Sequence, residues 1–248
     1  MMLSDPLQWP SPPDDLAAPT PGEVHLWSVD LDVEIGSGLA SALSPAEQAR
    51  AAGFRSAVDA RRFVAGLLMR RSVLGRYLGL DAAAVRFRED DNGRPELAGE
   101  GHDLRFNVSH SGHIGLLAVT HASAIGVDVE VPQAFPDRDR VARDTFHPQE
   151  VAAIDVFASE PERQAAFYRC WTRKEALAKA AGLGFHLPFD GFAVEVAEVD
   201  EPRVLAVDPK MPLSGPWVLR DLSAPPRLYA ALAMPRRAER ITAWRWRP

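Results

Sequence analysis

The chain has 248 residues, of which 46% are hydrophobic and 25% are charged, and its formal net charge is −6. This length and apolar content suffice for a substantial core, in one large domain or two smaller ones, and exclude a chain that is disordered throughout. The negative balance argues against a nucleic-acid binder that relies on overall positive charge. The single cysteine, Cys170, excludes an internal disulfide framework, and we expect a cytoplasmic location.

The first 21 residues are rich in proline and contain no continuous apolar stretch. They resemble neither a secretory signal nor a transmembrane helix, so we expect no membrane partner. We predict that residues 1–21 form a disordered lead-in.

The next segments alternate between strand and helix patterns. A β-rich run at Glu23–Leu31 predicts the first strand. Ser44 precedes a proline and stands three residues before Glu47, which is the pattern of a capping box at a helix start. Apolar residues at helical spacing predict a longer helix from about Val58 to Leu78, with arginines on its other faces. Strands then follow around a turn at Asp91-Asn92-Gly93: Val85–Arg88, Leu104–Val108, Ile114–Thr120 and Ala124–Glu130.

Helical texture returns from about Arg138 to Gly182. Five strand-like segments complete the chain: Phe192–Val196, Arg203–Val207, Trp217–Leu222, Leu228–Met234 and Ile241–Trp246. This order of elements predicts two α+β halves rather than regular βαβ alternation. A boundary near His121–Ser123 divides the ordered chain into the segments 22–121 and 122–248.

The first segment with chemical potential is Asn107-Val108-Ser109-His110-Ser111-Gly112, at the end of a predicted strand. Two hydroxyls, an imidazole and a flexible backbone can hold phosphate oxygens, although turn formation also explains these residues. A Ser-His nucleophile pair is disfavoured because adjacent strand residues point to opposite faces and no Gly-x-Ser-x-Gly elbow is present. Zinc at His110 and His113 is disfavoured because no further Cys or His lies at metal-site spacing.

The second segment is Gly126-Val127-Asp128-Val129-Glu130. Side chains alternate along a strand, so Asp128 and Glu130 face one space while the valines face the other. Such a carboxylate pair suits Mg²⁺, which binds one or two carboxylates together with water and substrate phosphates. The alternative is a half-exposed strand with an acidic outer face.

The third segment is a helix, Trp171–Gly182. At helical spacing Trp171, Glu175 and Lys179 fall on one stripe, with Lys174 at its border. An ordinary surface pair between Glu175 and Lys179 explains part of this pattern. Together, however, the three segments supply hydroxyls, three carboxylates and two ammonium groups, which is what metal-assisted phosphoryl chemistry requires.

At FNVSHSG, GVDVE and WTRKEALAKAAGLG the sequence resembles the 4'-phosphopantetheinyl transferase superfamily, in the long, monomeric class typified by the enzyme that activates surfactin synthetase. A weaker likeness extends from Leu43 to about Phe192. The resemblance implies a pseudo-dimer of two similar α+β halves, each a small antiparallel sheet packed with helices. Coenzyme A would bind in the cleft between the halves.

The resemblance also implies roles for the acidic residues and the lysine. Asp128, Glu130 and Glu175 match the metal ligands, with Mg²⁺ as the ion, and Lys179 matches the residue that contacts the phosphate under attack. Glu150 matches a further acidic active-site position. Glu175 or Glu150, directly or through water, would accept the proton of the attacking hydroxyl.

Five further residues match the family's contacts to coenzyme A. Ser109 and His110 would hold the nucleotide phosphates, and Arg94 matches a basic residue near the nucleotide. Arg50 and Arg62 match basic positions around the 3'-phosphate.

The sequence departs from the family at two positions close to the 3'-phosphate contacts. Glu47 stands where relatives carry a lysine, and Phe63 replaces a small hydroxyl residue beside Arg62.

The implied activity is transfer of the 4'-phosphopantetheine arm of coenzyme A to a serine hydroxyl of an apo acyl or peptidyl carrier protein. The products would be holo-carrier and 3',5'-adenosine bisphosphate, and the enzyme would be a monomer with an internal pseudo-twofold. Because carrier domains are acidic, Arg70 and Arg71 are candidate docking residues.

Two alternatives remain open at this point. One is another Mg²⁺-dependent phosphate enzyme such as a nucleotide hydrolase, although no G-x-x-x-x-G-K-[ST] loop is present. The other is a non-catalytic module that binds carrier proteins.

Overall fold

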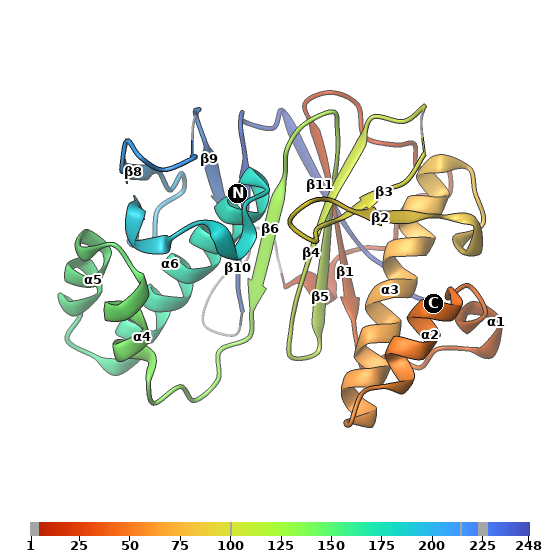
Figure 1. Cartoon of the computed structure of the whole chain (residues 1–248), viewed down its shortest axis with the longest axis horizontal. Helices are drawn as coiled ribbons and strands as arrows, with labels where there is room; N and C mark the ends of the chain where they lie inside the picture. The colour runs from red at the N-terminus through yellow and green to blue at the C-terminus, as the bar shows by residue number, and fades with distance from the viewer. Residues whose placement is uncertain (1–4, 100, 214, 223–227) are drawn as a thin grey trace.

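A computed structural model describes residues 5–99, 101–213, 215–222 and 228–248. It confirms the predicted α+β class. Two small sheets stand next to each other in the middle of the molecule, and a long helix covers the outer face of each (Figure 1). Within these described ranges, no helix is both long enough and apolar enough to cross a membrane.

The amino-terminal half begins after a short 3₁₀ turn, Pro6–Gln8, and contains a second one at Ala82–Ala84. Its helices and strands are β1 (Glu23–Asp30), α1 (Ser37–Ala40), α2 (Pro45–Ala52), α3 (Ala57–Leu78), β2 (Phe87–Glu89), β3 (Pro95–Leu97), β4 (Leu104–Ser111) and β5 (Ile114–His121).

The carboxy-terminal half has 3₁₀ turns at Gly184–His186 and Phe189–Gly191. Its helices and strands are β6 (Gly126–Glu130), α4 (Arg138–Thr145), α5 (Pro148–Asp155), α6 (Glu160–Ala181), β7 (Phe192–Val194), β8 (Val204–Val207), β9 (Val218–Asp221), β10 (Tyr229–Met234) and β11 (Arg240–Arg245).

The two halves repeat one plan. Strands β1, β5 and β4 form an antiparallel sheet in that order, and β6, β10 and β9 do the same in the second half. The covering helices α3 and α6 each have 22 residues, and each ends at a glycine in the left-handed conformation, Gly79 and Gly182. The last strand, β11, crosses over and pairs in parallel with β1 of the first sheet. The division at residue 121 itself stays a prediction.

Three hydrophobic clusters hold these layers together. One lies between α3 and the first sheet, one lies between α6 and the second sheet, and the third joins the two sheets. The third cluster contains Leu26 and Leu116 from the first sheet and Val127, Val129 and Leu232 from the second. The two halves therefore share a buried interface, which fixes β6 beside β4.

Residues 5–21, predicted to be a disordered lead-in, pack on the folded halves instead; residues 1–4 lie outside the described ranges. Trp9 is only 3% exposed and belongs to the cluster between the sheets. The main chain also contributes, because Ser28 donates a hydrogen bond to the carbonyl of Pro6 and Arg245 N–H donates to that of Pro10. Buried aromatic surface and these hydrogen bonds offset the cost of ordering a proline-rich segment.

Most helix and strand predictions agree with the structure. The capping box at Ser44 and Glu47 is present at the start of α2. The sequence did not predict β3, which pairs with β2 in a hairpin around the predicted turn. Strand β4 also extends further than expected, to Ser111.

The prediction that Arg70 and Arg71 contact a carrier protein is wrong for a physical reason, because both side chains are largely buried. Arg71 is 3% exposed and donates hydrogen bonds to Glu47 and to the carbonyls of Ala82 and Val85. The Arg70 guanidinium lies over the ring of Phe87, 4.2 Å from its centre. Both arginines join α3 to neighbouring segments within the first half.

Gly126, at the start of β6, has no space for a side chain. A Cβ there would lie 2.0 Å from the carbonyl oxygen of Ala176 and 2.4 Å from the nitrogen of Ala180, both on α6. We expect Gly126→Ala to reduce the free energy of unfolding by about 3 kcal/mol, because β6 and α6 must move apart. Chemical denaturation measures this loss. Gly38→Ala is the control, since nothing lies within 4 Å of a Cβ there, and equal stability of both variants would contradict the close packing.

Candidate active site

The site is built where β6 runs beside β4. The N–H groups of Val127, Val129 and Val131 face β4 but have no backbone partner there. They donate instead to side chains of β4: Asn107 Oδ1 at 2.9 Å, Ser109 Oγ at 3.3 Å and Ser111 Oγ at 3.1 Å, respectively. These bonds give acceptors to the N–H groups along the unpaired edge of β6. Without them, these donors would be buried and without a hydrogen bond.

Asp128 lies at the centre of this junction and is 4% exposed. Its Oδ1 accepts hydrogen bonds from Ser109 Oγ at 2.8 Å and from Lys179 Nζ of α6 at 2.6 Å. Its Oδ2 is buried and has no hydrogen-bond partner among the described residues. Burial raises the pKa of Asp128, and the charge of Lys179 opposes that rise.

Glu130 and Glu175 complete a group of three carboxylates. Ser111 Oγ donates to Glu130 Oε2 at 2.6 Å, and burial raises the pKa of Glu130. Burial raises the pKa of Glu175 to about 7, and the negative charges of Asp128 and Glu130 contribute to the same rise. The carboxylates from strand β6 and helix α6 therefore interact electrostatically.

Mg²⁺ is the ion that the residue types suggest, and the three carboxylates can be compared with the ligands that it prefers. Within the described ranges, no three His, Cys, Asp or Glu side chains lie close enough together to form a ready-made ion site. The chemistry of the three carboxylates nevertheless fits a hard cation. Asp128 has one buried oxygen without a partner, and Lys179 neutralises the other. Burial raises the pKa of all three carboxyl groups, and neighbouring carboxylates add to the rise for Glu130 and Glu175.

Glu150 does not share this space. Its side chain is 0% exposed and forms an ion pair with Lys174, which is also 0% exposed. Glu150 also accepts N–H bonds from Val194 and His147, while Lys174 donates to the carbonyl of Phe192. These bonds join α5, α6 and β7. Lys174 was expected to lie at the border of the stripe with Glu175 and Lys179, but it faces Glu150 instead of the three carboxylates. The catalytic role of Glu150 stays a prediction.

Ser109 and His110 behave differently from each other. The Ser109 hydroxyl donates to Asp128 and accepts from Val129 N–H and from Lys179 Nζ at 3.0 Å. His110 is exposed, and it points to the opposite face of β4. The segment is thus strand rather than turn, and Ser109 acts on the carboxylate cluster.

Arg94 lies at the junction of the halves, in the hairpin of β2 and β3. Its guanidinium binds Asp90 and Glu96 and comes within 3.5 Å of the Lys179 carbonyl. Asn92 of the same turn donates to the carbonyl of Gly182 at 2.7 Å. The hairpin turn thereby contacts the end of α6, one turn of helix from the candidate site.

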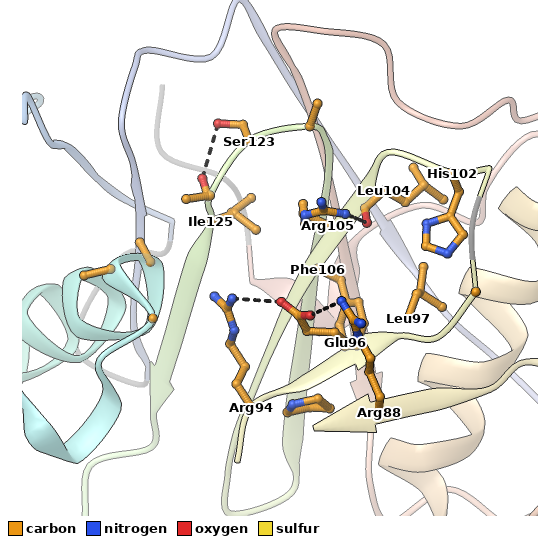
Figure 2. A pocket seen from close by; sticks show the side chains of 17 residues that line it. Arg88, Arg94, Glu96, Leu97, His102, Leu104, Arg105, Phe106, Ser123 and Ile125 are labelled. Atoms are coloured by element: carbon orange, nitrogen blue, oxygen red, sulfur yellow. Dashed lines mark hydrogen bonds and ion pairs between the residues drawn. The ribbon is translucent and has the colours of Figure 1, made fainter. Parts of the chain in front are cut away.

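A pocket of about 360 Å³ opens beside this hairpin (Figure 2). Arg94 and Arg88 both bond to Glu96 at its edge, and Arg105 and His102 border it on the other side. Phe106 also lines the pocket, whereas the residues of the carboxylate cluster do not. The pocket is adjacent to the cluster but separate from it.

Arg50 and Arg62 lie at the other end of the first half, near the start of α3. Arg62 forms a bidentate ion pair with Asp32, with N–O distances of 2.7 and 2.8 Å. The Arg50 guanidinium lies over the ring of Phe63, 5.1 Å from its centre. Phe63, which departs from the family pattern, therefore holds an arginine that the resemblance assigns to phosphate binding, and that role stays a prediction.

Two residues of the site were missing from the predicted set. Ser111 holds Glu130, and Trp171 also forms a hydrogen bond with that carboxylate. The two-residue spacing of Asn107, Ser109 and Ser111 was the available signal, because it places all three on one face of a strand.

The raised pKa of Glu175 makes a prediction about stability without metal. A folded-state pKa of about 7, against an ordinary value of 4.5, gives stability that is complete below pH 4.5 and is lost as the pH rises to 7. In EDTA at pH 8, Glu175→Gln should therefore be more stable than the parent by on the order of 1 kcal/mol. The gain should shrink as the pH falls to 5. Thermal unfolding across this range measures it, and a gain that does not depend on pH would contradict the clustering.

The buried pair makes a second prediction. Glu150→Gln leaves Lys174 charged and without a carboxylate partner, so the free energy of unfolding should fall by about 3–5 kcal/mol. Denaturant unfolding measures the loss. Glu162→Gln is a control at an exposed capping-box position of α6, and a similar cost for both would contradict the structural role of Glu150.

Comparison with known proteins agrees with the resemblance. A family model described as "4'-phosphopantetheinyl transferase, N-terminal" matches residues 36–122, and one described as "4'-phosphopantetheinyl transferase superfamily" matches residues 124–225. The 4'-phosphopantetheinyl transferase HetI of Nostoc sp. is 33% identical over 230 residues, which is 91% of this chain and 90% of that protein. The 4'-phosphopantetheinyl transferase Sfp of Bacillus subtilis is 30% identical over 69% of this chain and 75% of its own. The chain therefore belongs to the 4'-phosphopantetheinyl transferase superfamily.

Proposed function

We propose that the chain transfers the 4'-phosphopantetheine arm of coenzyme A to a serine hydroxyl of an apo carrier protein, at the cluster of Asp128, Glu130, Glu175 and Lys179. The observation that carries this proposal is the meeting of strand β6 and helix α6. At this meeting point, Asp128 is buried with one oxygen that lacks a hydrogen-bond partner, and the Lys179 ammonium group lies 2.6 Å from its other oxygen. Family membership supplies the reaction, and the geometry supports the residues.

Asp128, Glu130 and Glu175 would hold Mg²⁺, with the unpartnered Oδ2 of Asp128 as the first ligand. When bound, the ion neutralises charge on the pyrophosphate of coenzyme A. Lys179 is held by Asp128, Ser109 and the carbonyl of Val127. These bonds use all three ammonium hydrogens, so Lys179 would exchange one of them for a substrate phosphate oxygen and would then stabilise the leaving 3',5'-adenosine bisphosphate.

Glu175 is the preferred acceptor for the proton of the carrier serine. Its pKa of about 7 belongs to the site without an ion, and bound Mg²⁺ would lower it, so the proton would reach Glu175 directly or through a water. The serine oxygen attacks the phosphorus that carries pantetheine, the bond to the departing nucleotide breaks, and the proton passes to Glu175. Glu150 is the other candidate, and its buried pair with Lys174 favours Glu175 for this role.

The remaining assignments concern the substrates. Arg94 is next to Lys179 and suits the nucleotide phosphates, while Arg50 and Arg62 are assigned to the 3'-phosphate through the family pattern. His110 is exposed and is assigned, with Ser109, to the nucleotide phosphates of coenzyme A through the same family pattern. The physiological carrier protein, a monomeric state and a cytoplasmic location also stay predictions.

The assay incubates the protein with coenzyme A, Mg²⁺ and an apo carrier protein and then measures the mass of the carrier. We expect the carrier to gain one phosphopantetheine, and Asp128→Asn to reduce the rate by at least about 100-fold because it removes a buried negative charge from the ion site. Asp155→Asn, at an exposed carboxylate of α5, should keep the parental rate.

The other outcomes separate the alternatives. Nucleotide release without modification of the carrier would identify a hydrolase, and an unmodified complex would identify a binding module. Near-parental turnover of Asp128→Asn would disprove the assigned site while leaving the reaction in place.

A further inference from the structure

Strands β4 and β6 run in the same direction and meet without a backbone ladder. Three side-chain bonds replace that ladder, from the residue pairs 107 and 127, 109 and 129, and 111 and 131. The offset of twenty residues is constant, so the strands are in parallel register. Each acceptor is two residues beyond the previous one, on the same face of β4.

The three acceptors differ in what they do next. Ser109 and Ser111 accept a backbone N–H and donate their own hydrogen to the carboxylates of Asp128 and Glu130. Asn107 accepts the N–H of Val127 but contacts no carboxylate in the described hydrogen bonds. At this strand junction, two of the three acceptors therefore pass on a hydrogen bond to a carboxylate, and the third, the Asn107 amide, does not.

We propose that Ser111 is a positioning residue that orients the Glu130 carboxylate for the metal ion. This inference rests on the proposed function. Val131 N–H fixes the hydroxyl oxygen at 3.1 Å, which directs the hydroxyl hydrogen to Glu130 Oε2 at 2.6 Å. One oxygen of Glu130 is thereby restrained, and the carboxylate plane is set with respect to Asp128.

Glu130 needs such a restraint for two reasons. It has three rotatable side-chain bonds and stands at the end of β6, where its side chain is only partly buried. The negative charge of the neighbouring Asp128 also repels that of Glu130. Without the hydroxyl, the carboxylate would keep only its bond to Trp171 and would be less ordered, so forming the ion site would require ordering it again.

The test compares Ser111→Ala with Asn107→Ala. Both remove one side-chain acceptor from the β4–β6 junction, but only the first frees a carboxylate. Mn²⁺ affinity is measured by electron paramagnetic resonance of the free ion, at saturating coenzyme A, with the melting temperature of each variant recorded in EDTA. We expect Ser111→Ala to weaken Mn²⁺ binding about 10-fold and Asn107→Ala to change it by less than about twofold.

A conservative change supplies the rescue. Ser111→Thr keeps the hydroxyl and should bind Mn²⁺ within about twofold of the parent. If Ser111→Ala does not fold, Ser111→Cys takes its place, since a thiol has similar size and is a much weaker hydrogen-bond donor. Turnover should follow the same order, with the loss reversed by high Mn²⁺ rather than by high coenzyme A.

Two results would overturn the proposal: unchanged Mn²⁺ affinity in Ser111→Ala, or in Ser111→Cys where that variant replaces it, or equal losses in Ser111→Ala and Asn107→Ala. Asp128→Asn distinguishes this failure from failure of the metal assignment. If Asp128→Asn binds Mn²⁺ as well as the parent, the ion site itself is wrong and the role of Ser111 with it. If Asp128→Asn loses Mn²⁺ affinity but Ser111→Ala does not, the ion site stands and Glu130 is oriented by other contacts.

Discussion

The arrangement of the site depends on the unpaired edge of β6. Three N–H groups of this strand face β4 and donate hydrogen bonds to its side chains rather than to its main chain. A backbone ladder would place no hydroxyl between the strands. Side-chain closure instead brings Ser109 and Ser111 directly to the carboxylates of Asp128 and Glu130. The serine hydroxyls that join the two halves thus also hold the carboxylates.

Buried charge has two distinct roles in the molecule. The pairs of Arg71 with Glu47 and of Lys174 with Glu150 are complete, since each cation finds a carboxylate and main-chain carbonyls. Such pairs join α3 and α6 to neighbouring segments and leave nothing for a substrate. The cluster around Asp128 is incomplete, with one unpartnered oxygen. Incomplete neutralisation in a buried place is what separates a site from a structural contact.

The internal repeat explains why the candidate site lies between the two halves. Each half alone provides a three-stranded sheet and a covering helix, but no single half contains both the serines and the acids. Ser109 comes from the first sheet, whereas Asp128 and Lys179 come from the second sheet and its helix. The cross-over of β11 onto β1 and the cluster between the sheets hold these parts in one register. Gly126 contributes by allowing β6 to approach α6 closely.

The sequence alone determined the elements and the type of chemistry. Local spacing was sufficient to predict the capping box at Ser44, the long helix α3, the alternation of Asp128 and Glu130, and the stripe of Glu175 and Lys179. These are properties of neighbouring residues on one strand or helix, so periodicity reveals them.

Only the tertiary structure decided which charged groups are free. Arg71, Lys174 and Glu150 have the residue types of a binding site, yet partners distant in the chain bury and neutralise them. Conversely, Ser111 gained a role only when β6 came to lie beside β4. The order of residues 5–21 likewise depends on surfaces that distant strands create. Spacing along the chain fixes the face on which a side chain lies, but the partner on that face comes from elsewhere in the fold.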